Sequence, residues 1–249
     1  MRIKTIFLSS MLFLSMILFS CSVKNTKSES SNLIDVSIGL NEIQEGYKKL
    51  LLQDSILMDI LYRVDIKNIS DFSAQSSISY SRVCMSGKDD EFKYHQVFTS
   101  YNNLSQEGNS PDVTEYIYDS KSYKTITNGE SVILSDATHL SKEKLLQCSV
   151  GEWKVEDIKE IYKVISGNYC QYTVVLSDSH FDKHSHDGDS DNIPQKLLTR
   201  TYIVALNLET GIIEHTSQHD VSNVNMFGET EQYNRYTDCS YQFSLEDTD

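Results

Sequence analysis

The sequence predicts an α+β fold in which a helical N-terminal region precedes an antiparallel sheet. Apolar residues recur at helical spacing over residues 38–64, and from about residue 78 they alternate with polar residues, as in half-buried strands. Asn128 followed by Gly129, and residues 208–211, are turn signals between alternating stretches. Composition agrees, because 39% hydrophobic and 10% aromatic residues suffice for a folded core.

The first twenty residues predict an export signal that ends at a lipid attachment site. Two basic residues precede an apolar stretch over residues 6–19, which is short for a membrane span. The stretch ends in Leu18-Phe19-Ser20-Cys21, which resembles the lipobox of bacterial lipoproteins. The resemblance implies a diacylglyceryl group on Cys21 and cleavage before it, and two acyl chains hold a protein to a membrane. The alternatives are an ordinary signal peptide with an unrelated cysteine, or an uncleaved anchor helix.

Cleavage would divide the chain into the signal peptide 1–20, a lipidated polar tether 21–37 and one α+β domain 38–249. It leaves 20 basic residues against 36 acidic ones, a net charge of −16 in place of −14. So acidic a domain excludes sequence-independent nucleic-acid binding, which needs a basic face. It is also repelled by an anionic membrane surface. We expect the domain at the extracytoplasmic face of a cell membrane, held there by its lipid.

Helices are expected at the start of the domain and again in its middle. One or two helices are predicted over residues 38–64, with Asn41 as a candidate N-cap. A short helix over residues 141–147 and a longer one over 155–165, ended by Gly167, form a predicted helical insertion. Trp153 lies between them and is expected in the core.

Strands are expected where apolar and polar residues alternate, and most of the fifteen tyrosines fall in these segments. The last strand is expected to close the chain as an edge or penultimate strand of the sheet. The predicted strands cover residues 78–83, 92–97, 113–118, 123–127, 132–134, 169–176, 199–206, 212–218 and 233–243.

This layout resembles that of bacterial lipoproteins with a LolA/LppX-like half-barrel. Residues 115–123 are similar to the unit Tyr-x-x-Asp-Gly-Lys-x-Tyr of such proteins, and residues 203–213 to a late hairpin with Asp-x-x-Thr-Gly at its turn. Ser120 and Asn207 stand where Gly and Asp are common. The resemblance implies a curved antiparallel sheet with the N-terminal helix and the helical insertion packed on its concave face, around an apolar cavity for acyl chains. It carries over no individual ligand-binding residue.

Residues 178–192 hold three of the seven histidines and five aspartates. Imidazoles and carboxylates bind Zn²⁺ where a loop folds around the ion. A calcium loop is excluded, because Asn192 and Leu198 stand where such a loop needs glycine and a bidentate glutamate. The alternative is a solvated loop between two strands, and no cofactor is expected. The candidate metal ligands are His180, His184, His186, Asp187 and Asp189.

Four cysteines remain besides Cys21: Cys84, Cys148, Cys170 and Cys239. In an exported chain they could form two disulfides in three possible pairings. Cys170 and Cys239 both fall on predicted strands that could be neighbours. Buried free thiols are the alternative, and no Cys-x-x-Cys supports a redox or zinc motif.

No enzyme motif stands out: there is no Gly-x-Ser-x-Gly, no His-Glu-x-x-His and no phosphate-binding glycine loop. Ser141 with Lys144 has Ser-x-x-Lys spacing, but without companion motifs it is better explained as a helix N-cap. The leading hypothesis is a non-enzymatic, membrane-anchored lipoprotein that binds a lipid or other apolar ligand in a half-barrel cavity. The alternative is a cell-envelope interaction or scaffold lipoprotein with a protein partner and an exposed patch. A hydrolase with a dispersed site is a third hypothesis.

Overall fold

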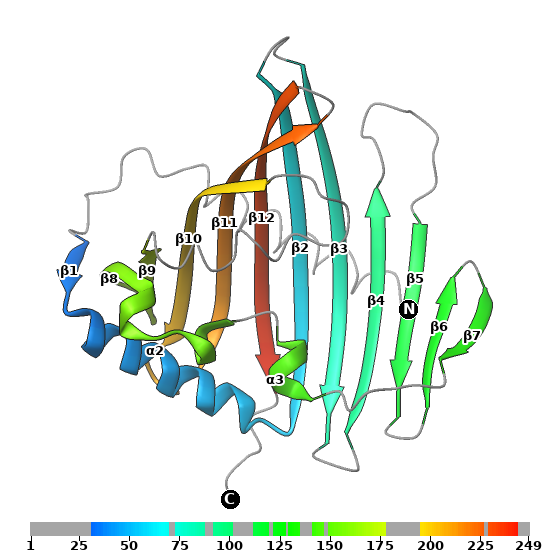
Figure 1. The fold of residues 1–249 in the computed structure, drawn as a ribbon. Coiled ribbons are helices and arrows are strands. Elements are labelled where there is room, and N and C mark those ends of the chain that lie inside the picture. The colour runs from blue at the N-terminus through cyan, green and yellow to red at the C-terminus, as the bar shows by residue number, and fades with distance from the viewer. Residues whose placement is uncertain are drawn as a thin grey trace, which may run out of the picture. The chain divides into compact units, whose positions relative to one another are not determined.

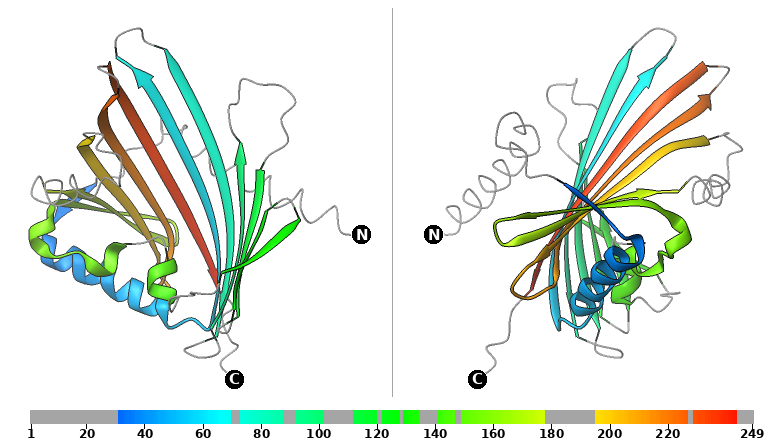
Figure 2. Two further views of the ribbon diagram at one scale, coloured as in Figure 1. Left: turned by 45° about the vertical axis from the view of Figure 1, so that its right-hand side comes forward. Right: turned by 90° about the vertical axis from the view of Figure 1, so that its left-hand side faces the viewer.

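The strands of the domain form a single antiparallel sheet in the order β1-β8-β9-β10-β11-β12-β2-β3-β4-β5-β6-β7 (Figure 1). The sheet is curved and strongly twisted (Figure 2). The strands are β1 Asn32–Ile34, β2 Ser55–Asn68, β3 Ala74–Ser86, β4 Lys93–Tyr101, β5 Asp112–Tyr118, β6 Tyr123–Thr127, β7 Glu130–Leu134, β8 Ile158–Ser166, β9 Tyr169–Leu176, β10 Gln195–Asn207, β11 Ile213–Met226 and β12 Glu229–Phe243. This computed structural model describes residues 31–69, 73–87, 92–101, 112–119, 122–127, 129–134, 141–146, 149–177, 195–226 and 229–243, and all but Ser31 lie in one unit, residues 32–249.

Most of the predicted strands are confirmed, several with longer bounds. The strand predicted at 169–176 coincides with β9. The predicted turns are also present: Gly129, between β6 and β7, and Gly211, between β10 and β11, have φ angles of 84° and 66°. These positive φ values favour glycine over residues with a Cβ. The short-range hairpin signals in the sequence therefore located these connections correctly.

The position of the last strand differs from the prediction of an edge or penultimate strand. β12 pairs with β11 on one side and with β2 on the other, so it lies inside the sheet. Cys239 and Tyr241 on this strand are buried accordingly. The pairing of β12 with β2 joins the last strand of the domain to one of its first, and alternation within a strand carries no information on such a long-range partner.

One long helix among the described residues, α2 (Val36–Leu51), packs on one face of the sheet. It begins earlier than expected, because the Asp35 side chain accepts hydrogen bonds from two backbone N–H groups of the first turn, while Asn41 lies inside the helix. The predicted tether 21–37 is therefore too long: its last residues form β1 and the start of α2. The apolar stripe of the helix is buried as predicted and includes Leu40, Ile43, Tyr47 and Leu50.

Two of the predicted helices are wrong. Residues 55–64 form most of β2, and residues 158–165 form most of β8. Gly167 does not cap a helix but makes the turn between β8 and β9, with a φ angle of 57°. Both segments place apolar residues at spacings that fit a helix and a strand equally well, and β-branched residues in them favour the strand.

The predicted helical insertion is reduced to three short turns. These are α3 (Lys142–Leu145) and the 3-10 turns η2 (Ser149–Glu152) and η3 (Val155–Asp157). Ser141 directly precedes α3, as expected for its N-cap. Trp153 is buried as predicted, and its ring meets that of Tyr202 edge-on at 4.6 Å between centroids.

The core lies between α2 and the face of the sheet that we call the helix-bearing face. Strand alternation and register place Met58, Ile60, Val204 and Tyr241 on this face, and all four are almost completely buried. The main contacts of α2 are with β8, β10 and β11, towards one end of the sheet (Figure 2). The helix-bearing face of β3–β6 extends beyond these contacts.

Candidate functional site

The metal ligands predicted from the sequence lie outside the described residues, as do Cys21 and Cys148. These outside positions include His180, His184, His186, Asp187 and Asp189. Within the described ranges, no three His, Cys, Asp or Glu side chains are grouped so that they could hold a metal ion. None of the helices described is both long and apolar enough to cross a membrane.

The three described cysteines are too far apart, or face the wrong way, to form disulfides with one another, and the pairings with Cys148 lie outside the described residues. β10 and β11 lie between Cys170 on β9 and Cys239 on β12. Three strand spacings of about 4.8 Å separate the two by roughly 14 Å, whereas a disulfide needs Cα atoms within about 7 Å. Cys84 is an exposed free thiol on the face of the sheet opposite to Cys239. The suggested pairing of Cys170 with Cys239 is therefore wrong.

A group of five tyrosines lies on the helix-bearing face of β2 and β4–β6, and we call it the tyrosine surface. Strand register aligns Tyr94, Tyr118 and Tyr123 in one row across β4, β5 and β6. The ring of Tyr116 stacks with that of Tyr123 at 6.4 Å between centroids. Tyr94 and Tyr118 are buried, whereas Tyr62, Tyr116 and Tyr123 are half-buried against the core.

Burial raises the pKa of three tyrosines of this surface, Tyr62, Tyr94 and Tyr123. Burial, with a smaller effect from Cys239, raises the pKa of Tyr62 to about 12. Burial also raises the pKa of Tyr94, and the neighbouring hydroxyls of Tyr123, Tyr62 and Tyr116 add to that rise. The Tyr94 hydroxyl donates to Gln96. The surface therefore offers aromatic rings and neutral hydroxyl groups, which suits apolar or weakly polar ligands.

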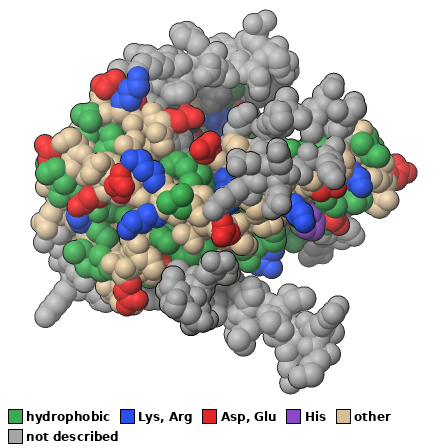
Figure 3. Space-filling model, turned by 90° about the horizontal axis from the view of Figure 1, so that it is seen from below, with side chains coloured by type: hydrophobic (Ala, Val, Ile, Leu, Met, Phe, Trp, Pro, Cys, Tyr) green, Lys and Arg blue, Asp and Glu red, His purple; other side chains and the backbone are tan. Residues whose placement is uncertain are grey.

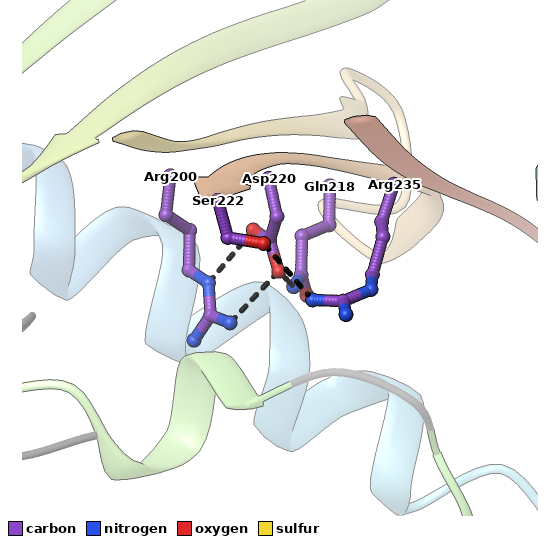
Figure 4. Close-up of polar contacts among 5 residues, drawn as sticks. All are labelled: Arg200, Gln218, Asp220, Ser222 and Arg235. Carbon is purple, nitrogen blue, oxygen red and sulfur yellow. Dashed lines mark hydrogen bonds and ion pairs between the residues drawn. The ribbon is translucent and has the colours of Figure 1, made fainter. Parts of the chain in front are cut away.

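A second group, which we call the arginine cluster, lies on the same face of β10, β11 and β12. It consists of Arg200, Gln218, Asp220, Ser222 and Arg235 (Figure 4). Register places Arg200 opposite Asp220 and Asp220 opposite Arg235, so the three charges form one row across three strands. Alternation puts them on the helix-bearing face, since Tyr202 and Val204 follow Arg200 at two-residue steps and are buried there.

The central carboxylate of the cluster is held by three hydrogen bonds. Asp220 accepts hydrogen bonds from Arg200 Nε and Nη2, each at 2.8 Å, and from Gln218 Nε2 at 2.8 Å. Its side chain is 6% exposed and that of Arg200 is 21% exposed. Burial alone would lower the pKa of Arg200, but the hydrogen bonds to Asp220 and the charge of that residue raise it overall, so the guanidinium stays charged.

Arg235 is held differently. Its Nη1 donates to Ser222 Oγ at 3.4 Å, and its guanidinium carbon lies 5.2 Å from the centre of the Tyr233 ring. No carboxylate among the described residues lies within ion-pair distance of it. Because Asp220 neutralises only Arg200, the cluster carries a net charge of about +1 at the position of Arg235.

Sequence reasoning missed the arginine cluster, because its members come from three strands and form no local motif. The alternation of the strand could have indicated it, because Arg200 lies on the same side as Tyr202 and Val204, where an apolar residue is expected. On the side seen from below, basic, acidic and apolar side chains are interspersed over the described surface (Figure 3). The described surface in this view shows no single large patch of one kind.

The described part of the chain is thus an open antiparallel sheet with one long packed helix, a tyrosine surface and an arginine cluster. No family model matches its sequence, and no characterised protein matches it closely enough to count as a relative. Solved structures with partial similarity include the ywiB protein from Bacillus subtilis, at 9% identity, covering 80% of this chain and 100% of that one with a TM-score of 0.22. A DUF1329 family protein from Desulfovibrio piger has 11% identity, coverage of 84% and 93%, and a TM-score of 0.24.

A LolA superfamily protein from Nitrosomonas europaea has 10% identity, covering 86% of this chain and 96% of that one, with a TM-score of 0.24. The structural neighbours therefore include the superfamily that the layout of the sequence resembles. TM-scores of 0.22–0.24 carry no argument about a ligand. The functional reasoning below rests on the side chains of this chain.

Proposed function

We propose that this chain is a non-enzymatic, membrane-anchored lipoprotein that binds a lipid or other apolar ligand on the helix-bearing face of its sheet. The observation that supports the proposal most directly is the tyrosine surface. Half-buried aromatic rings adjoin the core there, on strands that lie beyond the main contacts of α2. Rings that are apolar on their faces and carry a neutral hydroxyl are well suited to line a binding surface for apolar molecules.

The packing of α2 decides where such a ligand would lie. Ile43, Leu50 and Ile213, on the helix and the strand beneath it, are completely buried, so side chains fill the region under α2. A ligand inserted there would have to displace the helix, at the cost of the packing of its apolar stripe. We therefore place the ligand beside the helix, along the tyrosine surface, and not in a cavity enclosed beneath it.

The anchoring part of the proposal rests on residues 1–21. The lipobox-like sequence Leu18-Phe19-Ser20-Cys21 supports lipid attachment at Cys21, with the domain on the extracytoplasmic side. Cys21→Ser removes the attachment atom and leaves the domain unchanged. We expect the protein to move from the membrane fraction to the soluble fraction when cells producing this variant are fractionated. Unchanged fractionation would overturn the anchoring proposal.

The ligand-binding part is tested with N-phenyl-1-naphthylamine, an uncharged apolar fluorophore that brightens when it leaves water. We expect saturable binding to the purified, detergent-free protein. Tyr62→Ser and Tyr116→Ser should each weaken binding about two- to tenfold, because an aromatic contact contributes roughly 0.5–1.5 kcal/mol beyond its buried area. Tyr162→Ser is the matched control, since Tyr162 lies on the opposite face of β8, bonded to Glu160.

The outcomes separate the candidate functions. Saturable binding that the two tyrosine variants weaken, and that the Tyr162 variant leaves unchanged, supports the tyrosine surface as the site. Equal effects of all three variants would remove the site from this surface. No binding of the fluorophore, together with no lipid in extracts of the purified protein, would overturn the ligand-binding proposal and favour an interaction or scaffold role.

A further inference from the structure

We propose that the arginine cluster binds an oxyanion, and that Arg235 receives the carboxylate or phosphate headgroup of an amphiphilic ligand. This inference rests on the proposed function, because it takes the tyrosine surface as the place of the apolar chain. It adds a chemical class to the ligand: an anionic amphiphile in place of a neutral one.

The first support is the exceptional position of Arg235 among the arginines described. Each of the other three forms an ion pair with an aspartate: Arg63 with Asp65 at 2.9 Å, Arg82 with Asp59 at 2.7 Å and Arg200 with Asp220 at 2.8 Å. Arg235 has no such partner in the described part of the chain, although the sequence holds 36 acidic residues. In so acidic a protein, a guanidinium that has no carboxylate as an ion-pair partner is the group to which an external anion would bind.

The second support is that Asp220, the carboxylate opposite Arg235, is bonded to other side chains. Asp220 lies opposite Arg235 across β11 and β12, but Arg200 and Gln218 already occupy its oxygens with three hydrogen bonds. Arg235 is turned to Ser222 instead, through one long bond of 3.4 Å. A carboxylate or phosphate offers the guanidinium two short, charge-assisted bonds, which are roughly twice as strong as neutral ones.

The third support is the position of the cluster beside apolar and aromatic side chains. Arg235 lies opposite Val64 on β2, and Tyr62 is two residues further along that strand, on the same face. One strand spacing and two residue rises put Tyr62 on the order of 8 Å from Arg235. A headgroup at Arg235 therefore leaves the attached chain at the edge of the tyrosine surface.

The test compares two amphiphiles that differ only in their headgroup, dodecyl phosphate and dodecanol, below the concentrations at which they aggregate. Isothermal titration calorimetry on the purified protein should show dodecyl phosphate binding at least about tenfold more tightly than dodecanol, with a preference that falls as salt is added. Inorganic phosphate is titrated separately. Inorganic phosphate should bind only weakly, because it lacks the apolar chain.

The decisive variant is Arg235→Gln, with Arg63→Gln as its control. Both remove one arginine charge from neighbouring strands, but Arg63 lies on the opposite face, paired with Asp65. Arg235→Gln should reduce the preference for dodecyl phosphate to less than about twofold and leave dodecanol binding unchanged, whereas Arg63→Gln should leave the preference intact. Unchanged circular dichroism and an unchanged urea midpoint verify that both variants are folded.

Each result bears on one of the two proposals. Equal binding of both amphiphiles to the wild type, or a preference that survives Arg235→Gln, overturns the headgroup site while the proposed function stands. Inorganic phosphate that binds as tightly as dodecyl phosphate assigns the cluster to a free anion and overturns the amphiphile. Binding of neither amphiphile overturns the proposed function, and the inference falls with it.

Discussion

The sharpest test of the arginine cluster as a structural unit is Asp220→Asn. This substitution keeps the shape of the side chain and removes the charge that neutralises Arg200. The side chain of Asp220 is 6% exposed and accepts three hydrogen bonds at 2.8 Å, whereas that of Arg200 is 21% exposed. Removing one partner of a fully buried pair costs about 3–5 kcal/mol, and an exposed pair contributes about 0–1 kcal/mol. Because Arg200 is partly exposed, we expect a loss of about 2–3 kcal/mol.

The loss is measured as the free energy of unfolding in urea, followed by circular dichroism, with a thermal melt in parallel. For a domain of this size, each kcal/mol lowers the melting temperature by about 2–4 °C, so the variant should melt about 4–12 °C lower. The urea slope should stay unchanged, because the surface exposed on unfolding is the same. A double variant Arg200→Gln/Asp220→Asn should recover part of the loss, since neither charge is then left without its partner.

Asp65→Asn is the matched control, because Asp65 pairs with Arg63 where the two side chains are 27% and 54% exposed. We expect it to cost less than about 1 kcal/mol. If Asp220→Asn costs no more than Asp65→Asn, the pair with Arg200 does not stabilise the sheet, and the reasoning about the cluster is refuted. A folded Asp220→Asn variant should also bind dodecyl phosphate more tightly than the wild type, because two guanidinium groups are then without a carboxylate.

Three further predictions concern other parts of the fold. Gly46→Val should lower the free energy of unfolding by about 1–3 kcal/mol in the same urea assay. The reason is that even a Cβ at position 46 would lie 2.7 Å from a side-chain atom of Leu206 on β10. A smaller loss would show that α2 can shift to make room. Burial raises the pKa of Glu42, but hydrogen bonds from Lys163 and Tyr172 and the charge of Lys163 lower it overall. The Glu42 carboxylate therefore stabilises the fold at pH values above its unfolded pKa of about 4.5. This contribution is lost as the pH falls through the lower pKa of the folded state. Glu42→Gln should flatten the pH dependence of the urea midpoint in that acidic range, and an unchanged profile would contradict the lowered pKa. Iodoacetamide should label Cys84 in the native protein and Cys170 only after unfolding, as read by peptide mass spectrometry, and labelling of both at equal rates would contradict the burial of Cys170.

Sequence periodicity located the elements whose pattern fits only one structure. Leu40, Ile43, Tyr47 and Leu50 are spaced for a helix and for nothing else, and α2 is present where they lie. Ile56 and Ile60, by contrast, are four residues apart, a spacing that fits one face of a helix and one side of a strand alike. The segment was predicted as a helix, but it is part of β2. What decides such a segment is pairing with β3 and β12, which are distant in sequence and cannot be inferred from local spacing.

The arginine cluster was beyond prediction for a related reason. Arg200, Asp220 and Arg235 stand on three successive strands, and only the register of β10 with β11 and of β11 with β12 places them in one row. A shift of either pairing by one residue would turn a charge to the opposite face. The position of Arg200 in the alternation of its strand indicates a charged side chain on the buried face. Its partner Asp220 could not be identified without the register of β10 with β11.

The pairing of β12 with β2 connects the two parts of the proposed site. The tyrosine surface comes from β2 and β4–β6, which follow one another early in the chain, whereas the arginine cluster comes from β10–β12 at its end. Residues 231–243 of β12 pair with residues 56–68 of β2, and within this pairing Arg235 meets Val64. A ligand with an apolar chain and an anionic headgroup would therefore bridge the first and last parts of the sequence across this one strand pair. Such a ligand binds only the paired state, so it should raise the free energy of unfolding in proportion to the logarithm of its concentration.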